Sequence, residues 1–217
     1  MQGTPLMSQW GEGTADKPWV IKTVLFGDSS AGTETVYYRL TEDKYTEHKV
    51  HELPPSSPRP LDIKEKCCRV NIVQPLLPIF GNGPPVFSRY FNSHVCVVVV
   101  NTALPTQHAY IQKVMAAFEE SKDNPYREYI LVSNVDKTKP REFSTAQAEE
   151  WATQHNMMFV EVDATEDVGP ILIEKLKEAL DKVLLNIDRF PKPSGKLIKL
   201  EQQPTIKYSP LQSCNMI

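Results

Sequence analysis

The stretch Val24-Leu25-Phe26-Gly27-Asp28-Ser29-Ser30-Ala31-Gly32-Thr33-Glu34-Thr35 decides how the rest of the chain is interpreted. Three apolar residues end a predicted strand, the two glycines stand five positions apart, and a short helical pattern follows. This is the layout of a loop that cradles phosphate with its backbone N–H groups. Thr33 and Glu34, however, occupy the positions where that motif has Lys and Ser or Thr. The sequence therefore predicts the shape of a phosphate-binding loop without its usual chemistry.

Length and composition are those of a globular protein. The 217 residues suit one domain with tails, and a hydrophobic fraction of 41% allows a substantial core. The net charge of −3 does not favour nucleic acid as a partner. We expect neither a disulfide framework nor a zinc site, because the four cysteines lack the spacing for either; they are Cys67, Cys68, Cys96 and Cys214. With no signal peptide and no apolar run of membrane-spanning length, we expect a cytoplasmic protein.

Strand and helix patterns alternate along the chain. Strands are predicted at 20–26, 66–73, 94–101, 129–134 and 157–162, and helices at 33–40, 106–120, 144–155 and from 170 onward. The strand at 94–101 contains four consecutive valines and is expected to be buried on both faces. The segment 52–60 contains four prolines, so it is a loop or a sheet edge. This order predicts an α/β fold, a doubly wound, mainly parallel sheet with helices on both faces.

Two helices carry further marks. Ser144-Thr145-Ala146-Gln147 is a capping box that predicts the start of one helix. The last helix has a buried stripe at Ile173, Leu176, Leu180, Val183 and Ile187. We therefore predict a flexible arm at 1–19, in which Trp19 packs on the first strand, a domain at 20–187 and a flexible tail at 188–217.

In the order of its segments the chain resembles a small GTPase of the Ras superfamily, and the Rab branch in particular. The resemblance implies the small G-protein or P-loop fold, with a six-stranded sheet, over residues 20–187. Four local matches carry it, namely the loop at 27–32 followed by Tyr38-Arg39-Leu40-Thr41-Glu42-Asp43-Lys44-Tyr45, the pair Tyr90-Phe91, the stretch Leu131-Val132-Ser133-Asn134-Val135-Asp136, and the segment 144–165 ending Phe159-Val160-Glu161-Val162-Asp163-Ala164-Thr165.

The resemblance also implies where a guanine nucleotide would bind. Its positions are Gly27, Asp28, Ser29, Ser30, Ala31, Gly32, Thr33, Glu34, Thr35, Asn134, Asp136 and Ala164. Thr33 replaces the Lys that reaches the phosphates, and Glu34 replaces the hydroxyl that holds magnesium. Val135 stands where the base-recognition motif has Lys, and Asp136 comes one position early. Either Asp136 binds a guanine edge, or Asn134 and Asp136 only form a turn, which these residue types favour.

The family's magnesium ligands and catalytic residues are missing. The Thr of the first switch aligns near Glu52, and the Asp-x-x-Gly of the second switch aligns with Gln74-Pro75-Leu76-Leu77. No acidic residue occurs between Glu65 and Glu119, so no realignment supplies that Asp. Because magnesium supplies much of the charge stabilisation in phosphoryl transfer, we expect GTP hydrolysis to be lost, with no metal and no catalytic residue, and GTP or GDP to bind weakly or not at all.

The main hypothesis is a Rab-like pseudo-GTPase that acts as a protein-binding platform in membrane trafficking or signalling. Its effectors or regulators would contact the Pro-rich former switches, where the candidate contact residues are Phe80, Phe87, Tyr90 and Phe91. Phe87 and Phe91 could instead pack in the core. The alternatives are an atypical small GTPase that still binds guanine nucleotide, and an unrelated α/β enzyme that uses the loop for another phosphate ligand.

The C-terminal Cys214-Asn215-Met216-Ile217 resembles a prenylation box at the end of a tail that contains five basic residues after Asp188. Lipidation of Cys214 would attach the protein to the cytosolic face of an internal membrane. The other possibility is a solvated tail with a free cysteine.

Overall fold

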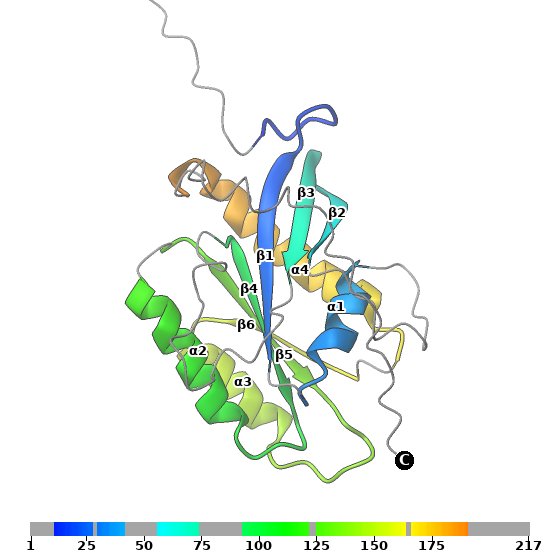
Figure 1. Cartoon of the computed structure of the whole chain (residues 1–217), viewed down its shortest axis with the longest axis vertical. Coiled ribbons are helices and arrows are strands. Elements are labelled where there is room, and N and C mark those ends of the chain that lie inside the picture. Colours follow the sequence, from blue (N-terminus) through cyan, green and yellow to red (C-terminus); the bar gives the residue numbers. More distant parts are fainter. Residues whose placement is uncertain are drawn as a thin grey trace, which may run out of the picture.

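The computed structural model describes residues 11–27, 30–41, 56–73, 93–121, 125–163 and 166–190, and nothing below concerns the structure of the others (Figure 1). Strands and helices alternate along much of the described chain, as the sequence predicts, except where two strands follow each other directly as a hairpin. The elements are β1 (Trp19–Gly27), α1 (Thr33–Thr41), β2 (Ser56–Ile63), β3 (Lys66–Val73), β4 (Val95–Asn101), α2 (Gln107–Ser121), β5 (Glu128–Asn134), α3 (Thr145–Gln154), β6 (Met158–Val162), α4 (Gly169–Leu185) and a short 3-10 helix (Ile187–Arg189).

The six strands form one sheet in the order β2-β3-β1-β4-β5-β6. Every neighbouring pair is parallel except β2–β3, which is antiparallel. Figure 1 shows β1 in the interior of the sheet, with β3 on one side and β4 on the other. The chain first extends the sheet on the β3 side of β1 and later on the β4 side. Ligands of open α/β sheets bind where the strand order reverses in this way, at the carboxyl ends of the strands.

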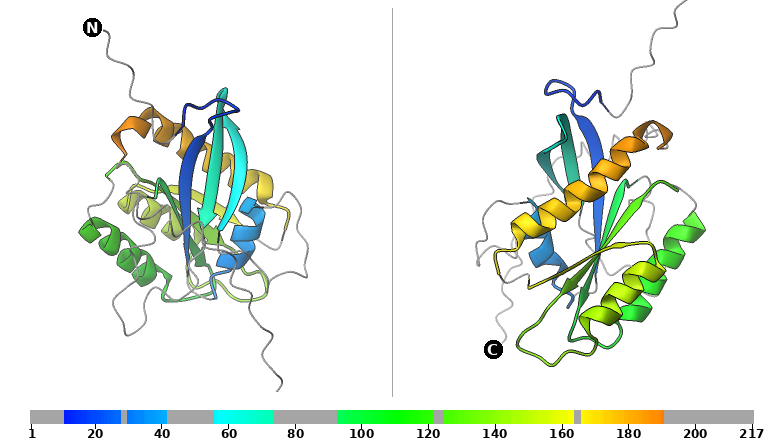
Figure 2. Two further views of the ribbon diagram at one scale, coloured as in Figure 1. Left: turned by 45° about the horizontal axis from the view of Figure 1, so that its top comes forward. Right: turned by 180° about the vertical axis from the view of Figure 1, so that it is seen from behind.

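Helices cover both faces of this sheet, which confirms the predicted α/β architecture. On one face Ile21 and Leu25 of β1 belong to a core that includes α1 and α4. On the other face Val24 and Phe26 belong to a second core with α2 and α3. The two views of Figure 2 show α2 and α3 side by side and α4 crossing the opposite face. The alternation of one strand between two cores follows from the twofold period of β structure.

The strongest local patterns give the elements that they predict. All seven residues of β4 are buried, as expected for a strand covered on both faces. Ser144 caps α3: Gln147 N donates to Ser144 Oγ at 3.2 Å, and Ser144 N donates to Gln147 Oε1 at 2.8 Å. The predicted stripe of α4 is buried, although Ile187 lies in the 3-10 helix that follows.

The Pro-rich segment forms part of the edge strand β2, so the edge alternative is the correct one. Within the described residues β2 pairs only with β3, and the hairpin between them turns at Lys64 and Glu65, which have φ of 44° and 67°. In a two-residue hairpin the residues that flank the turn, here Ile63 and Lys66, form a hydrogen-bonded pair. Hydrogen-bonded and non-hydrogen-bonded pairs then alternate along the two strands. Pro58 and Pro60 occupy non-hydrogen-bonded positions of this ladder. The side on which each proline lacks an N–H therefore faces away from β3, toward the outer edge of the sheet.

The packed part of the chain extends beyond the predicted domain, residues 20–187, at both ends. Residues 11–18 form a turn that contacts β3, where Cys67 N donates to Gly13 O at 2.9 Å. Trp19 is partly buried against the core, as expected. At the other end Phe190 is buried and stacks on His94, with 4.5 Å between the ring centroids.

Candidate functional site

The loop between β1 and α1 lies at the carboxyl edge of the sheet, where the strand order reverses. Gly27 ends β1, and Thr33 begins α1. A Cβ atom on Gly27 would stand 1.9 Å from Thr33 Oγ1 and 3.1 Å from Val99 O. Gly32 has φ of 81°, and a Cβ atom there would stand 2.3 Å from Asn134 Nδ2. Both glycines are therefore required by close packing in the described structure, whether or not the loop holds a ligand.

Thr33, at the position of the motif's lysine, is packed inside the protein. The residue is 8% exposed, and its hydroxyl oxygen has no hydrogen-bond partner within the described segments. The close contact with Gly27 places this hydroxyl at the end of β1. Glu34 is exposed in the first turn of α1, and Thr35 is partly buried. The start of the helix therefore presents a carboxylate to solvent where the phosphate-binding motif presents a hydroxyl and a cation.

Two asparagines from the ends of neighbouring strands hold the backbone of the loop. Asn101, the last residue of β4, donates from Nδ2 to Ser30 O at 3.1 Å. Asn134, the last residue of β5, donates from Nδ2 to Ala31 O at 3.0 Å. The prediction that Asn134 belongs at this edge is confirmed as a position, and its side chain supports the loop. Asn101 was not among the residues predicted for the site.

Asp136 forms a local turn. Its Oδ1 accepts from Thr138 N at 3.0 Å and from Thr138 Oγ1 at 2.5 Å. Its Oδ2 pairs with Lys139 Nζ at 3.0 Å. The hydrogen bond from the Thr138 hydroxyl, with those from Lys139 and from the Thr138 backbone, lowers the pKa of this carboxyl. These contacts are the ones expected of the turn alternative, and they engage both carboxylate oxygens.

Lys137, the next residue, joins the loops that follow β5 and β6. Its Nζ lies 3.1 Å from Asp163 Oδ2 and also pairs with Glu166 Oε1. Hydrogen bonds to Glu166 and then to Asp163 raise the pKa of the ammonium group. The side chain of Asp163 is 9% exposed, so one of the two carboxylates is nearly buried. The ammonium group of Lys137, whose side chain is 61% exposed, is therefore paired with two carboxylates of the chain.

Several predicted positions lie outside the described residues. They are Asp28, Ser29 and Ala164 of the nucleotide site, the contact residues Phe80, Phe87, Tyr90 and Phe91, and Cys214. Among the described residues, no group of three or more His, Cys, Asp or Glu side chains could hold a metal ion. None of the helices in these segments is both long and apolar enough to cross a bilayer.

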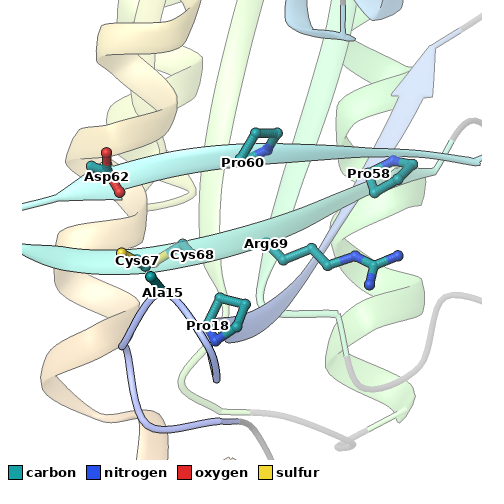
Figure 3. A pocket seen from close by; sticks show the side chains of 8 residues that line it. All are labelled: Ala15, Pro18, Pro58, Pro60, Asp62, Cys67, Cys68 and Arg69. Carbon is teal, nitrogen blue, oxygen red and sulfur yellow. The ribbon is translucent and has the colours of Figure 1, made fainter.

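A hollow of about 420 Å³ lies away from the loop, over the β2–β3 hairpin (Figure 3). The turn before β1 forms one wall through Ala15 and Pro18, and Pro58 and Pro60 form another. Cys67 lies beside Asp62, whose hydrogen bond with the thiol raises the pKa of Cys67, and burial raises the pKa of Cys68 to about 11. Both thiols are therefore protonated at neutral pH and are poor nucleophiles.

Two of the three described histidines, His94 and His108, stack on aromatic rings. His94, at the start of β4, is fully buried and accepts from Lys22 N through Nδ1 at 3.0 Å. His108 stacks on Trp151 with 4.7 Å between the centroids. His94 precedes β4 and so lies at the opposite end of that strand from the loop, whereas His108 lies in the first turn of α2 with its ring against Trp151.

Comparisons with known proteins leave the family open. The chain matches no protein-family model, and a search of curated proteins found no match to it.

Proposed function

We propose that this chain is a small-GTPase-like protein, most similar to the Rab branch, that acts by binding other proteins and has lost GTP hydrolysis. The six-stranded, mainly parallel sheet with helices on both faces agrees with what the sequence resemblance implies. So does the position of the glycine-containing loop, which joins β1 to α1 at the carboxyl edge. These features support the proposed small G-protein fold, which other doubly wound proteins share in its coarser features.

The observation that carries the loss of activity is the environment of Thr33 and Glu34. A phosphate in this loop would find a buried Thr33 in place of a cation and the exposed carboxylate of Glu34 at the helix start. A hydrogen bond to a charged group contributes roughly 1.5–3 kcal/mol, so the missing Lys alone lowers affinity by about ten- to 150-fold. The carboxylate adds repulsion and is itself stabilised by the helix N-terminus.

The region that would recognise a base is also engaged internally. Asp136 is occupied by Thr138 and Lys139, and Lys137 is bound to Asp163 and Glu166. A guanine would have to displace these contacts before it could be bound. We therefore place the atypical, nucleotide-binding GTPase second to the protein-binding platform.

The proposed platform acts through the former switches and is held at a membrane. Phe80, Phe87, Tyr90 and Phe91 remain the proposed contact residues for effectors or regulators in membrane trafficking or signalling. Prolines in these segments stiffen the chain, which suits one constant conformation better than a nucleotide-driven switch. A prenyl group on Cys214 would hold the protein on the cytosolic face of an internal membrane.

The decisive test is whether the purified full-length chain binds nucleotide. Acid extraction should release no stoichiometric GDP or GTP, and fluorescent GDP and GTP should bind no tighter than about millimolar, with or without magnesium. Magnesium-dependent, GTP-selective binding at micromolar or tighter affinity would refute the proposal. Glu34→Gln provides a matched comparison, since it removes the exposed charge at the helix start and should raise any residual affinity. Lys113→Gln, on α2, is the control for a surface charge away from the loop.

Membrane attachment is tested separately. Cys214→Ser should move the protein from the membrane fraction to the cytosol, whereas Cys67→Ser should leave its distribution unchanged. An unchanged membrane fraction for Cys214→Ser would remove the lipid anchor from the proposal and leave the binding platform in place.

A further inference from the structure

We propose that Asn101 is a positioning residue which, together with Asn134, holds the loop segment Ser30–Gly32 in shape without a bound ligand. The inference goes beyond the proposed function, because it concerns how the loop keeps its backbone geometry. It does not depend on which partners the protein binds. It rests on two amide side chains, the carbonyl groups that they contact, and the glycine that allows their approach.

The orientation of the Asn101 amide is determined by its own contacts. Its Oδ1 accepts from Ala103 N at 2.8 Å, so Nδ2 is the atom directed at Ser30 O. Its backbone N donates to Gln107 Oε1 at 3.1 Å, in a buried hydrogen bond. The residue is only 7% exposed. Asn101 is therefore fixed at its backbone and its side-chain oxygen, which leaves Nδ2 as a preorganised donor for the loop.

Asn134 supplies a second donor from the adjacent strand. Asn101 and Asn134 are partners in the parallel register of β4 and β5. Thr102 N donates to Asn134 O at 3.0 Å, which ties together the two chain segments that follow these residues. Two neighbouring strand ends thus direct amide donors at two consecutive carbonyls, those of Ser30 and Ala31.

The loop is adapted to this contact. At Gly32 a Cβ atom would stand 2.3 Å from Asn134 Nδ2, and φ is in the left-handed region at 81°. Any other residue would both strain the backbone and displace the asparagine. Gly32 O then accepts from Val36 N at 3.1 Å, which is the first hydrogen bond of α1. The two asparagines therefore set the position from which α1 begins.

A loop held in this way keeps its order in the absence of ligand. In a ligand-supported loop, stability rises with the ratio of ligand concentration to Kd. Here the same carbonyls are held by side chains that belong to the sheet, so their order depends on β4 and β5. Loss of either amide donor should loosen the loop and the first turn of α1 while the sheet remains folded.

Hydrogen exchange of the nucleotide-free full-length chain tests this inference. Asn101→Asp keeps the acceptor for Ala103 N but replaces the donor to Ser30 O with a carboxylate oxygen. We expect amide exchange in residues 30–36 to accelerate at least tenfold, the scale of one lost buried hydrogen bond, with little change in β5 and β6. Asn134→Asp should have the same local effect. Asn71→Asp, which adds the same charge on β3, is the matched control and should leave residues 30–36 unchanged.

Exchange in residues 30–36 at the wild-type rate in both variants would overturn the inference, and so would equal acceleration in the control. Should Asn101→Asp unfold the chain, Asn101→Ser is the second variant, because it removes the amide donor, leaves only a shorter hydroxyl and adds no charge. For that variant, too, a wild-type rate overturns the inference. Nucleotide binding by the wild-type protein would refute the proposed function but not this comparison, since every sample is stripped of nucleotide.

Discussion

Replacement of His94 by Phe should remove a specific loss of stability in acid. His94 is fully buried at the start of β4, accepts from Lys22 N through Nδ1, and stacks on Phe190. Burial, with smaller effects of the charges of Lys22 and Arg127, lowers the pKa of His94 from 6.5 to about 3. The imidazole is therefore neutral in the folded protein over a range in which the unfolded chain binds a proton.

The sign and size of the effect follow from proton linkage. Because the pKa of His94 is lower in the folded than in the unfolded protein, only the unfolded chain takes up a proton as the pH falls from 6.5 toward 3. The free energy of unfolding is therefore unaffected by the titration of His94 above pH 6.5 and decreases below it. Each pH unit in this window costs up to about 1.4 kcal/mol, so the wild-type protein should lose roughly 2–3 kcal/mol between pH 7.5 and 4.5 through His94 alone. His94→Phe keeps a ring against Phe190 but leaves Lys22 N without this acceptor, which costs about 1–3 kcal/mol at all pH values.

The measurement is urea unfolding of wild type and His94→Phe at pH 7.5, 6.0, 5.0 and 4.5. Carboxylates titrate in both proteins, so the difference between their free energies of unfolding is the informative quantity. We expect wild type to be the more stable at pH 7.5 and to lose this advantage by pH 4.5. Phe190→Leu is the control, because it removes the stacked ring and retains His94 and therefore the direction of the pH dependence. A difference between wild type and His94→Phe that is constant with pH would refute the reasoning.

Three further predictions concern backbone positions. Glu65→Gly should raise the free energy of unfolding by about 0.5–1 kcal/mol in urea titration, because φ is 67° at this hairpin position and glycine adopts that conformation without strain; a loss of stability would contradict it. Gly32→Ala should cost about 2–3 kcal/mol in the same assay, from left-handed strain and a displaced Asn134, and a cost below about 0.5 kcal/mol would show that the loop adjusts freely. Replacement of both Pro58 and Pro60 by Thr should restore N–H donors to the outer edge of β2 and raise the tendency to associate, seen as a concentration-dependent increase in mass over wild type in size-exclusion chromatography with light scattering. A mass equal to that of wild type would mean that the prolines do not protect this edge.

Local patterns were sufficient for most of the fold. The four consecutive valines of β4, the capping box at Ser144 and the apolar stripe of α4 each gave the predicted element. Burial on both faces, a reciprocal cap and a helical period are each encoded within a few residues. The prolines of β2 left two alternatives open. Pairing with β3 decides between them, and that pairing depends on a neighbouring strand and cannot be derived from the segment itself.

The support of the loop could not be predicted in the same way. Asn101 contacts a residue 71 positions away, and Asn134 contacts one 103 positions away. Their side-by-side placement depends on the register of β4 against β5. The pairing of Lys137 with Asp163 likewise requires β6 to lie next to β5. The available signal was a polar residue at the end of a parallel strand. Both asparagines carry it, but only Asn134 was predicted to belong to the site.

A phosphate-binding motif usually combines a particular backbone geometry with residues that bind the phosphate, and the loop at 27–35 has the first without the second. Its glycines are required by packing, since Gly27 accommodates Thr33 and Gly32 accommodates Asn134. The residues that would act on a ligand are absent from the same loop, where Thr33 is buried and Glu34 is exposed. Glycine spacing therefore reports the backbone geometry of such a loop, and the residues that follow the second glycine report its chemistry. In this chain the backbone geometry of Ser30 and Ala31 is tied to Asn101 and Asn134 of the sheet.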